Sequence, residues 1–210
     1  MFDSLEQLFD AIADVQYVVL RNYEEFQTMG FLQNHPDIDF LCENREQMVE
    51  QLQLKPRRRK NDGIHYYVEI AGKRVSVDLR TVGDGYLDAD WEKGILQRRV
   101  SNDNYYVLQS EDYFYSLLYH VIVQKHAVAE DYKVRLAAMS KNLGIPFRIE
   151  DKEQCLDTYM RKQGYHYTYP EFAGTIFHIE NVDASLVEQA FGKKVRRAFY
   201  QKVRRLLRKG

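Results

Sequence analysis

The segment that most constrains the fold of this chain is "DIDFLC", residues 37–42. Polar and apolar residues alternate along it, and successive side chains of a β-strand point to opposite faces of a sheet, so Ile38 and Phe40 share one face. Asp37 and Asp39 then lie side by side on the other. Two neighbouring carboxylates repel each other unless water or a cation lies between them, and a hard divalent cation prefers carboxylate oxygens. The segment therefore predicts a strand with either two solvated acids or a metal site.

A third acid lies on a second alternating strand, "RVSVDLR", residues 74–80. This strand follows "IHYYVEI", residues 64–70, across the short loop "AGK", which predicts a β-hairpin. Asp78 shares a face with Ser76, opposite the valines. If this strand lies beside "DIDFLC", the three acids converge at one edge of one sheet face. They could then hold one or two Mg²⁺ ions against a nucleoside triphosphate (NTP), and Asp78 could accept a proton from an attacking hydroxyl.

The pattern of helices and strands predicts an α+β fold. Ser4 and Gln7 have capping-box spacing at the start of a first helix, and Asn44 stands three residues before Gln47 at the start of a second. The elements expected before the hairpin are a helix at 3–15, a strand at 16–22, a connection at 23–36, the strand at 37–42 and a helix at 43–52. We expect a small mixed or antiparallel sheet flanked by helices in residues 1–100, followed by a helical subdomain in residues 101–210.

The first two helices after the hairpin are expected from the following segments. "DADWEKGIL" predicts a helix with Asp88 or Asp90 as its N-cap, and we interpret the acids of this segment as caps in preference to metal ligands. "SEDYFYSLLYHVIVQKH", residues 110–126, predicts a long helix with Ser110 as N-cap and a wide apolar face. Lys125 lies at the end of that face. His120 falls on another stripe with Gln124, where a hydrogen-bonded packing role is favoured over catalysis.

The order of these motifs resembles the nucleotidyltransferase fold of the DNA polymerase beta superfamily. More closely, "YVVLRNYEEF", "DIDFLC", "VDLRTVGDGYLDADWEKGIL" and "YFYSLLYHVIVQKH" together resemble bacterial nucleotidyltransferase-like proteins of surface polysaccharide gene clusters. The resemblance covers about residues 16–135. It implies that Asp37 and Asp39 are paired ligands of Mg²⁺ or Mn²⁺, and that Asp78 completes the metal site or activates the acceptor hydroxyl.

The chain departs from the superfamily at the end of the first strand. A Gly-Gly or Gly-Ser pair usually cradles the triphosphate there, whereas this chain has Arg21 and Asn22. The Arg21 guanidinium could bind phosphate oxygens and Asn22 could donate an amide hydrogen bond. Alternatively, Arg21 forms a surface ion pair with Glu24 or Glu25. Because a helical subdomain commonly closes over the nucleotide in this superfamily, Lys125 is also a candidate phosphate ligand, and Tyr119 or Tyr132 a candidate for stacking on the base.

Charge is unevenly distributed along the chain. Residues 193–210 contain nine of the 30 Lys and Arg residues and no acid, so the remaining chain has ten more acidic than basic residues. This segment predicts a basic amphipathic helix, beginning from an N-cap at Asp183, that binds an anionic membrane or nucleic acid, or else packs on the acidic body or is solvated. "KPRRRK", residues 55–60, is a second basic cluster. A Tyr-rich segment contributes residues that either contact an acceptor or pack: Tyr159, Tyr165, His166, Tyr167 and Tyr169.

Three classes of function remain open. The first is an enzyme that moves a nucleotidyl group from an NTP to a small, sugar-linked or lipid-linked acceptor, and it is favoured because the acid trio is intact. The second is a toxin-like nucleotidyltransferase that modifies tRNA or protein through the basic segments. The third is a non-catalytic nucleotide-binding or interaction module, which the missing Gly-Ser pair favours. The N-terminus is unlike a signal peptide and no apolar run could span a bilayer, so we expect a cytoplasmic protein without a transmembrane segment.

Overall fold

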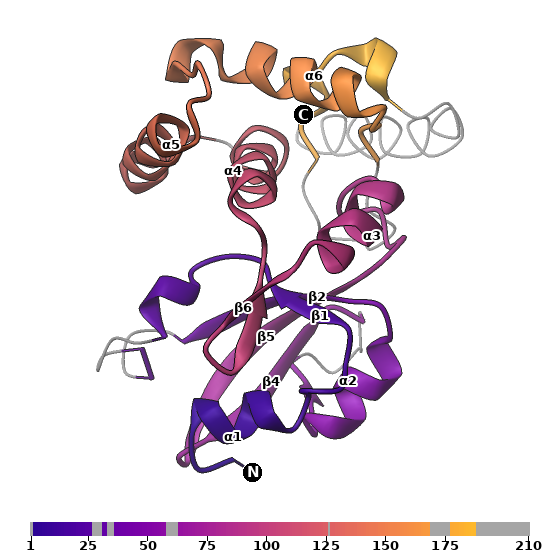
Figure 1. The fold of residues 1–210 in the computed structure, drawn as a ribbon. Helices are drawn as coiled ribbons and strands as arrows, with labels where there is room; N and C mark the ends of the chain where they lie inside the picture. Colours follow the sequence, from indigo (N-terminus) through magenta and orange to yellow (C-terminus); the bar gives the residue numbers. More distant parts are fainter. Residues whose placement is uncertain are drawn as a thin grey trace, which may run out of the picture.

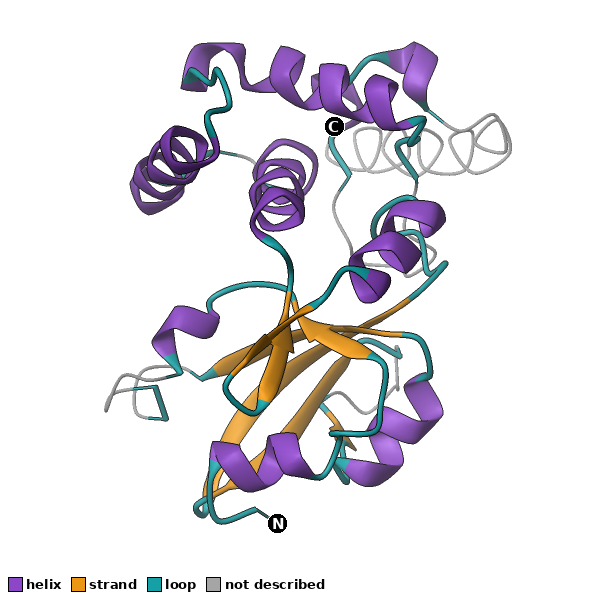
Figure 2. Cartoon of the chain, in the orientation of Figure 1, coloured by secondary structure: helices purple, strands orange, loops and turns teal. Residues whose placement is uncertain are grey.

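The computed structural model of the protein describes residues 2–26, 31–32, 36–57, 63–125, 127–168 and 177–187. These residues form a mixed α+β fold, in agreement with the expected class, with a sheet in one half and mainly helices in the other (Figure 2). The helices are α1 (Leu5–Asp10), α2 (Arg45–Gln51), α3 (Ala89–Gln97), α4 (Ser110–Tyr119), α5 (Glu130–Leu143) and α6 (Lys152–Gln163). The strands are β1 (Tyr17–Val19), β2 (Asp37–Cys42), β3 (Lys55–Pro56), β4 (His65–Ile70), β5 (Lys73–Thr81), β6 (Val100–Asn102) and β7 (Tyr105–Val107).

The strands form one mixed sheet in the order β3-β4-β5-β2-β1-β7-β6. β4 and β5 pair antiparallel, which confirms the predicted hairpin. β2 pairs antiparallel with β1 and parallel with β5, so the strand "DIDFLC" lies in the middle of the sheet. This central position explains the alternating apolar residues of the strand. A central strand pairs with a neighbour on both edges, and the apolar residues of one face pack in a core.

One face of the sheet packs against α1 and α2 (Figure 1). Its core contains the apolar members of the alternating strands, including Ile38, Phe40, Val75 and Val77, all fully buried. The predicted caps of α1 and α2 are present: the Ser4 and Asn44 side chains each accept a hydrogen bond from the backbone N–H three residues later. The first helix ends at Asp10, earlier than expected, and the chain continues in turns.

The opposite face carries the helical half over β1 and β2 (Figure 1). Trp91 of α3 lies at the centre of this second core and stacks on Tyr165. Its indole N–H donates to the buried Asp112 of α4, which also pairs with Arg98, so one buried carboxylate joins α3 to α4. Asp88 caps α3 as expected.

Several boundaries differ from the sequence-based expectation. The sheet continues past residue 100, because β7 pairs with β1 and β6 with β7. Ser110 is the first residue of α4 and Gln109 is its N-cap. At the other end, Asp183 caps only the 3₁₀ turn η5 (Ala184–Leu186). The expected basic helix falls in residues 188–210, which lie outside the described residues.

No helix within the described ranges combines the length and apolar character needed to cross a bilayer.

Candidate functional site

The three acids predicted from the sequence lie together at the middle of the sheet. Asp39 on β2 is directly opposite Asp78 on β5. Asp37 is two residues before Asp39 on β2 and is opposite Ser76. Each of the three can offer a carboxylate oxygen so that all three oxygens lie within 4.8 Å of one another. The parallel pairing of β2 with β5 produces this cluster, because it aligns two strands whose acids both point away from the α1/α2 core.

The environments of the three acids differ. Asp39 is buried, Asp78 is half-buried and Asp37 is exposed. Partial burial, followed by repulsion from Asp39 and Asp78, raises the pKa of Asp37 to about 6. Burial and the charge of Asp39 also raise the pKa of Asp78. The cluster is thus poor at holding three negative charges unless a cation accompanies them.

The raised pKa predicts that Asp37→Asn stabilises the protein in the absence of divalent cations. An acid whose pKa is raised in the folded state destabilises the fold increasingly as the pH rises from the unfolded value, near 3.8, to the folded value, about 6, and by a constant amount above that. Because Asp37 is exposed to solvent screening, we expect a gain of about 1 kcal/mol at pH 8. Urea unfolding with EDTA at pH 8 and pH 4 measures it. An equal effect at the two pH values would rule out charge repulsion.

Arg21, directly after β1, points at the acid cluster. Its Nη2 atom lies 2.8 Å from Asp39 Oδ1 in an ion pair, and its Nη1 atom donates to the Tyr86 hydroxyl at 2.5 Å. Burial lowers the pKa of Arg21, but Asp39 and Tyr86 more than offset this, so the pKa lies above its ordinary value. The alternative partner Glu24 instead accepts hydrogen bonds from Tyr113. Arg21 therefore supplies a positive charge to one of the three acids.

Arg80 and Tyr86 belong to the same site, although the sequence did not single them out. Arg80 follows Asp78 on the same face of β5 and lies with its guanidinium carbon 4.5 Å from the centre of the Tyr86 ring. Arg80 is buried, and its Nη1 atom is 3.8 Å from Asp84. The only sequence signal for Arg80 was the alternation that puts it on the face of Asp78. No sequence pattern indicated Tyr86, because its hydroxyl reaches Arg21 only through the folding of a loop.

Two buried carboxylates shape the loop that carries Tyr86. Asp84 accepts backbone hydrogen bonds from Thr81 and Tyr86. Glu92 of α3, fully buried, accepts from the N–H groups of Gly83 and Leu87. Burial raises the pKa of Glu92 to about 8, with the two N–H donors partly opposing it. These acids hold the loop in place, in accord with the interpretation of this segment's acids as caps.

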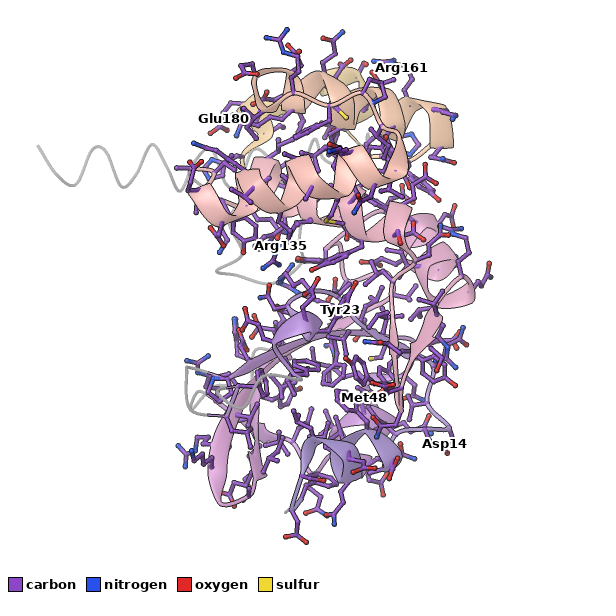
Figure 3. The ribbon with its side chains drawn as sticks, turned by 60° about the vertical axis from the view of Figure 1, so that its left-hand side comes forward. Asp14, Tyr23, Met48, Arg135, Arg161 and Glu180 are labelled. Carbon is purple, nitrogen blue, oxygen red and sulfur yellow. The ribbon has the colours of Figure 1, made fainter. Side chains whose placement is uncertain are left out.

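Asn22 takes the backbone conformation that a glycine usually supplies. Its φ of 60° and ψ of 16° are left-handed, which Asn tolerates better than most residues. The Asn22 side-chain oxygen accepts a hydrogen bond of 2.8 Å from Arg135 of α5. Figure 3 shows Arg135 on the side of the helical half that faces the segment of Tyr23. This contact engages the amide oxygen, whereas the phosphate-binding role expected for Asn22 would use the amide NH₂.

The end of α4 supplies further candidates on the helical side. The chain continues from α4 as a π-helical turn, η2 (His120–Gln124), a distortion often found at functional sites. His120 is buried and pairs through Nδ1 with Gln124 at 2.7 Å, the packing role that was favoured. Burial, then the charges of Arg21 and Lys125, lower the pKa of His120 well below its usual value. Lys125 is exposed at the end of this turn.

The candidate aromatic residues separate into two groups. Tyr132 is half-buried, its ring centre lies 6.0 Å from that of His120, and burial raises the pKa of its hydroxyl, which also responds to the charges of Arg21 and Asp39. It therefore lies on the site side of α5. The suggestion that Tyr119 stacks on a base is wrong, because its ring is buried beside Trp91 and Tyr167.

The C-terminal tyrosines that the structure describes are packing residues. Tyr159 and Tyr167 are buried, and Tyr165 stacks on Trp91. The backbone N–H of His166 donates to the α3 cap Asp88. Tyr169 lies outside the described residues.

The donor set of the cluster fits a hard divalent cation. Carboxylate oxygens are the ligands that Mg²⁺ and Mn²⁺ prefer, and the three available oxygens are close enough to share one ion. The raised pKa of Asp37 is consistent with this fit, because a cation would relieve the repulsion from Asp39 and Asp78 that adds to the effect of burial.

No family model matches the sequence, and no curated protein matches it at a significant level. Solved structures similar to the chain include the following two. One is an antigenic nucleotidyltransferase-like protein from Paracoccidioides brasiliensis, with 12% identity and a TM-score of 0.41 over 77% of this chain and 90% of that one. The other is the antibiotic-resistance factor ANT(2'')-Ia, with 12% identity and a TM-score of 0.40 over 75% of this chain and 89% of that one. Similarity this distant carries no argument about chemistry, which depends on the residues of the site itself.

Proposed function

We propose that this protein is a metal-dependent nucleotidyltransferase that moves a nucleotidyl group from an NTP to a small, sugar-linked or lipid-linked acceptor. The observation that carries the proposal is the cluster of Asp37, Asp39 and Asp78 on two adjacent strands, with Arg21 at its edge. Three carboxylates and one arginine around a single point suit the transfer of a phosphorus centre, since catalysis there is mainly positioning and charge neutralisation.

Each residue has a proposed role. Asp37, Asp39 and Asp78 hold Mg²⁺ or Mn²⁺, which when bound neutralises negative charge on the phosphate oxygens. Arg21 binds phosphate oxygens through its planar guanidinium fork, in the place where a glycine-rich turn would otherwise offer backbone amides. Asp78, the half-buried acid with a raised pKa, accepts the proton of the attacking hydroxyl.

The helical half supplies the remaining candidate contacts to the nucleotide. Lys125 is exposed at the end of the π-helical turn and electrostatically coupled to His120, beside Arg21, so it is placed to pair with a phosphate. Tyr132 is the aromatic residue best placed to stack on a base. Asn22 supports the turn that presents Arg21, through its contact with Arg135. A role in surface polysaccharide biosynthesis, within the cytoplasm, is part of the proposal and depends on the identity of the acceptor.

A specific observation favours one other candidate function, a nucleotide-binding or interaction module without catalysis. The Arg21 guanidinium already neutralises Asp39 at 2.8 Å, as a cation would. If Arg21 never leaves Asp39, the cluster is a structural ion pair with two further acids beside it. The two functions differ in one measurable property, which is the dependence of nucleotide binding on a divalent cation.

Thermal unfolding with each NTP, with and without Mg²⁺ or Mn²⁺, tests the proposed function. A ligand at 100 times its dissociation constant stabilises the native state by about 2.7 kcal/mol. We expect one NTP to raise the melting temperature of the wild-type protein only when the metal is present. We expect the Asp37→Ala/Asp39→Ala double variant to lose this shift. Stabilisation without metal would favour the non-catalytic module, and no shift with any NTP would remove the nucleotide site altogether.

A further inference from the structure

The sheet face that carries the three acids continues beyond them onto β4 and β3. Residues opposite each other on neighbouring strands present their side chains on the same face. Strand pairing therefore produces two rows across the sheet: Asp39, Asp78 and His65 in the first, and Asp37, Ser76, Tyr67 and Lys55 in the second. Arg57 follows β3 and extends the first row, because its backbone N–H bonds to the His65 carbonyl. Each row runs from the acids to a basic edge.

The side chains of β3, β4 and β5 in these rows are half-buried or exposed, whereas the alternate side chains of β4 and β5 are mostly buried on the other face. His65, Tyr67, Ser76 and Asp78 are half-buried, and Lys55 and Arg57 are exposed. The intervening residues, including Tyr66, Val68 and Val75, are buried in the core on the side of α1 and α2. A ligand could therefore lie on the rows without displacing core side chains.

Tyr67, midway along the second row, has two cations near its ring. The Arg74 guanidinium carbon lies 4.2 Å from the centre of the Tyr67 ring, and Lys55 Nζ lies 5.9 Å from it. Lys55 also pairs with Glu69 at 3.5 Å. Arg57 is two residues after Lys55, so the alternation of side chains puts it on the same side of the sheet.

The spacing of the strands sets the size of a ligand that reaches both ends. Neighbouring strands are about 4.8 Å apart, so the basic edge is about 10 Å from the strand of Asp78, with Tyr67 midway. The long side chains of Lys55 and Arg57 can reach back over part of this distance, and Arg74 of β5 lies against the Tyr67 ring. A single sugar ring with a phosphoryl substituent spans what remains.

We propose that this face binds the acceptor and that the acceptor is a phosphorylated sugar. The reacting hydroxyl lies at Asp78, the ring packs on Tyr67, and the phosphoryl group pairs with Lys55, Arg57 and Arg74. Aromatic side chains suit the apolar face of a sugar ring, and cations suit phosphate. This inference rests on the proposed nucleotidyl transfer and specifies its acceptor.

The reaction balances with the groups present. The acceptor hydroxyl oxygen attacks the α-phosphorus of the NTP, forming an O–P bond. The bond from the α-phosphorus to the oxygen that bridges to the β-phosphorus breaks, and pyrophosphate leaves with its electron pair. The hydroxyl proton passes to the Asp78 carboxylate. His65, whose Nε2 lies 3.9 Å from Asp78 Oδ1, orients that carboxylate and is a positioning residue.

A small acceptor suits the charge distribution better than a nucleic acid does. Outside residues 193–210 the chain has ten more acidic than basic residues, and the basic edge on β3 is only two strands from Asp78 of the acid cluster. A polymer bound at this edge would bring further phosphates against acidic surface, whereas a monosaccharide phosphate places its charge at the cations alone.

Binding of a panel of sugars to the full chain tests the inference. Calorimetry with Mg²⁺ and a non-hydrolysable NTP analogue would compare hexose 1-phosphates and 6-phosphates with the parent hexoses. We expect at least one phosphosugar to bind at least tenfold more tightly than its parent. The Lys55→Glu/Arg57→Glu variant should weaken that binding by tenfold or more, and Tyr67→Ala should weaken it as well. Lys73→Glu is the matched control, because Lys73 is an exposed cation of β5 on the opposite alternation.

Three results would overturn the inference. They are equal affinity for phosphosugar and parent, no binding of any phosphosugar, or the same affinity in the charge-reversed and control variants. Binding of a single-stranded RNA oligonucleotide by a protein that binds no phosphosugar would also overturn the inference and would indicate a nucleic-acid acceptor. The metal-dependent NTP shift, measured on the same samples, separates the two proposals. If the shift is present but phosphosugars do not bind, only the acceptor assignment fails.

Discussion

The Asp78→Asn variant is expected to lose metal-dependent NTP binding and turnover while keeping its fold. Loss of residues that merely orient metal ligands costs about 10- to 100-fold in affinity or activity, so loss of a direct ligand that also accepts the proton should cost more than about 100-fold. The fold should survive because burial and the charge of Asp39 already raise the pKa of Asp78, which means that its charge does not stabilise the folded state.

The measurement for Asp78→Asn is Mn²⁺ binding by electron paramagnetic resonance, with and without NTP, together with thermal unfolding. Asp90→Asn is a suitable control, because Asp90 is an exposed acid of α3 that pairs only with Lys93 among the contacts described. An Asp78→Asn protein that binds Mn²⁺ and NTP with wild-type affinity would remove Asp78 from the metal site.

The Arg21→Ala variant is expected to change two affinities in opposite directions. In the absence of nucleotide, Arg21 competes with a divalent cation for Asp39, through a charge-assisted hydrogen bond of 2.8 Å. Such bonds contribute about 1.5–3 kcal/mol, so their removal should raise the affinity for free Mn²⁺ by about tenfold or more. The affinity for the NTP in the presence of metal should fall by at least a similar factor, because the phosphate partner is lost.

Mn²⁺ binding by electron paramagnetic resonance, repeated with saturating NTP, measures both affinities. Arg21→Lys is the informative control, since a lysine keeps the charge but loses the planar fork. It should preserve the competition for Asp39 and still weaken NTP binding. If Arg21→Ala binds free Mn²⁺ no more tightly than wild type, Arg21 does not compete with the cation. If it keeps wild-type affinity for NTP, Arg21 is not a phosphate ligand.

The Asp78→Asn and Arg21→Ala variants together separate catalysis from a structural ion pair. In an enzyme, Arg21 must exchange Asp39 for phosphate as the nucleotide and metal bind, so the two ligands should each increase the affinity for the other. In a non-catalytic module, the Arg21–Asp39 pair persists and the affinity for Mn²⁺ does not depend on NTP. The presence or absence of coupling between Mn²⁺ and NTP binding therefore reports which of the two functions the site performs.

Parts of the candidate site could be anticipated because they depend on local pattern. Alternation along residues 37–42 and 74–80 puts Asp37, Asp39 and Asp78 on the faces opposite their apolar neighbours, and the structure shows the same division. The roles of Tyr86 and Arg135 could not be anticipated in this way. Each acts on a residue more than 60 positions away along the chain, Tyr86 on Arg21 and Arg135 on Asn22.

The sequence by itself determined the type of most elements, the caps of three helices and the face on which each acid lies, because these depend on interactions between residues close along the chain. Only the tertiary structure decided that β2 and β5 pair in parallel with Asp39 opposite Asp78, and that Arg21 faces Asp39. It also decided that Tyr119 is buried while Tyr132 lies at the site. Strand order, register and the burial of one aromatic over another follow from packing between distant segments, and no local periodicity encodes that packing.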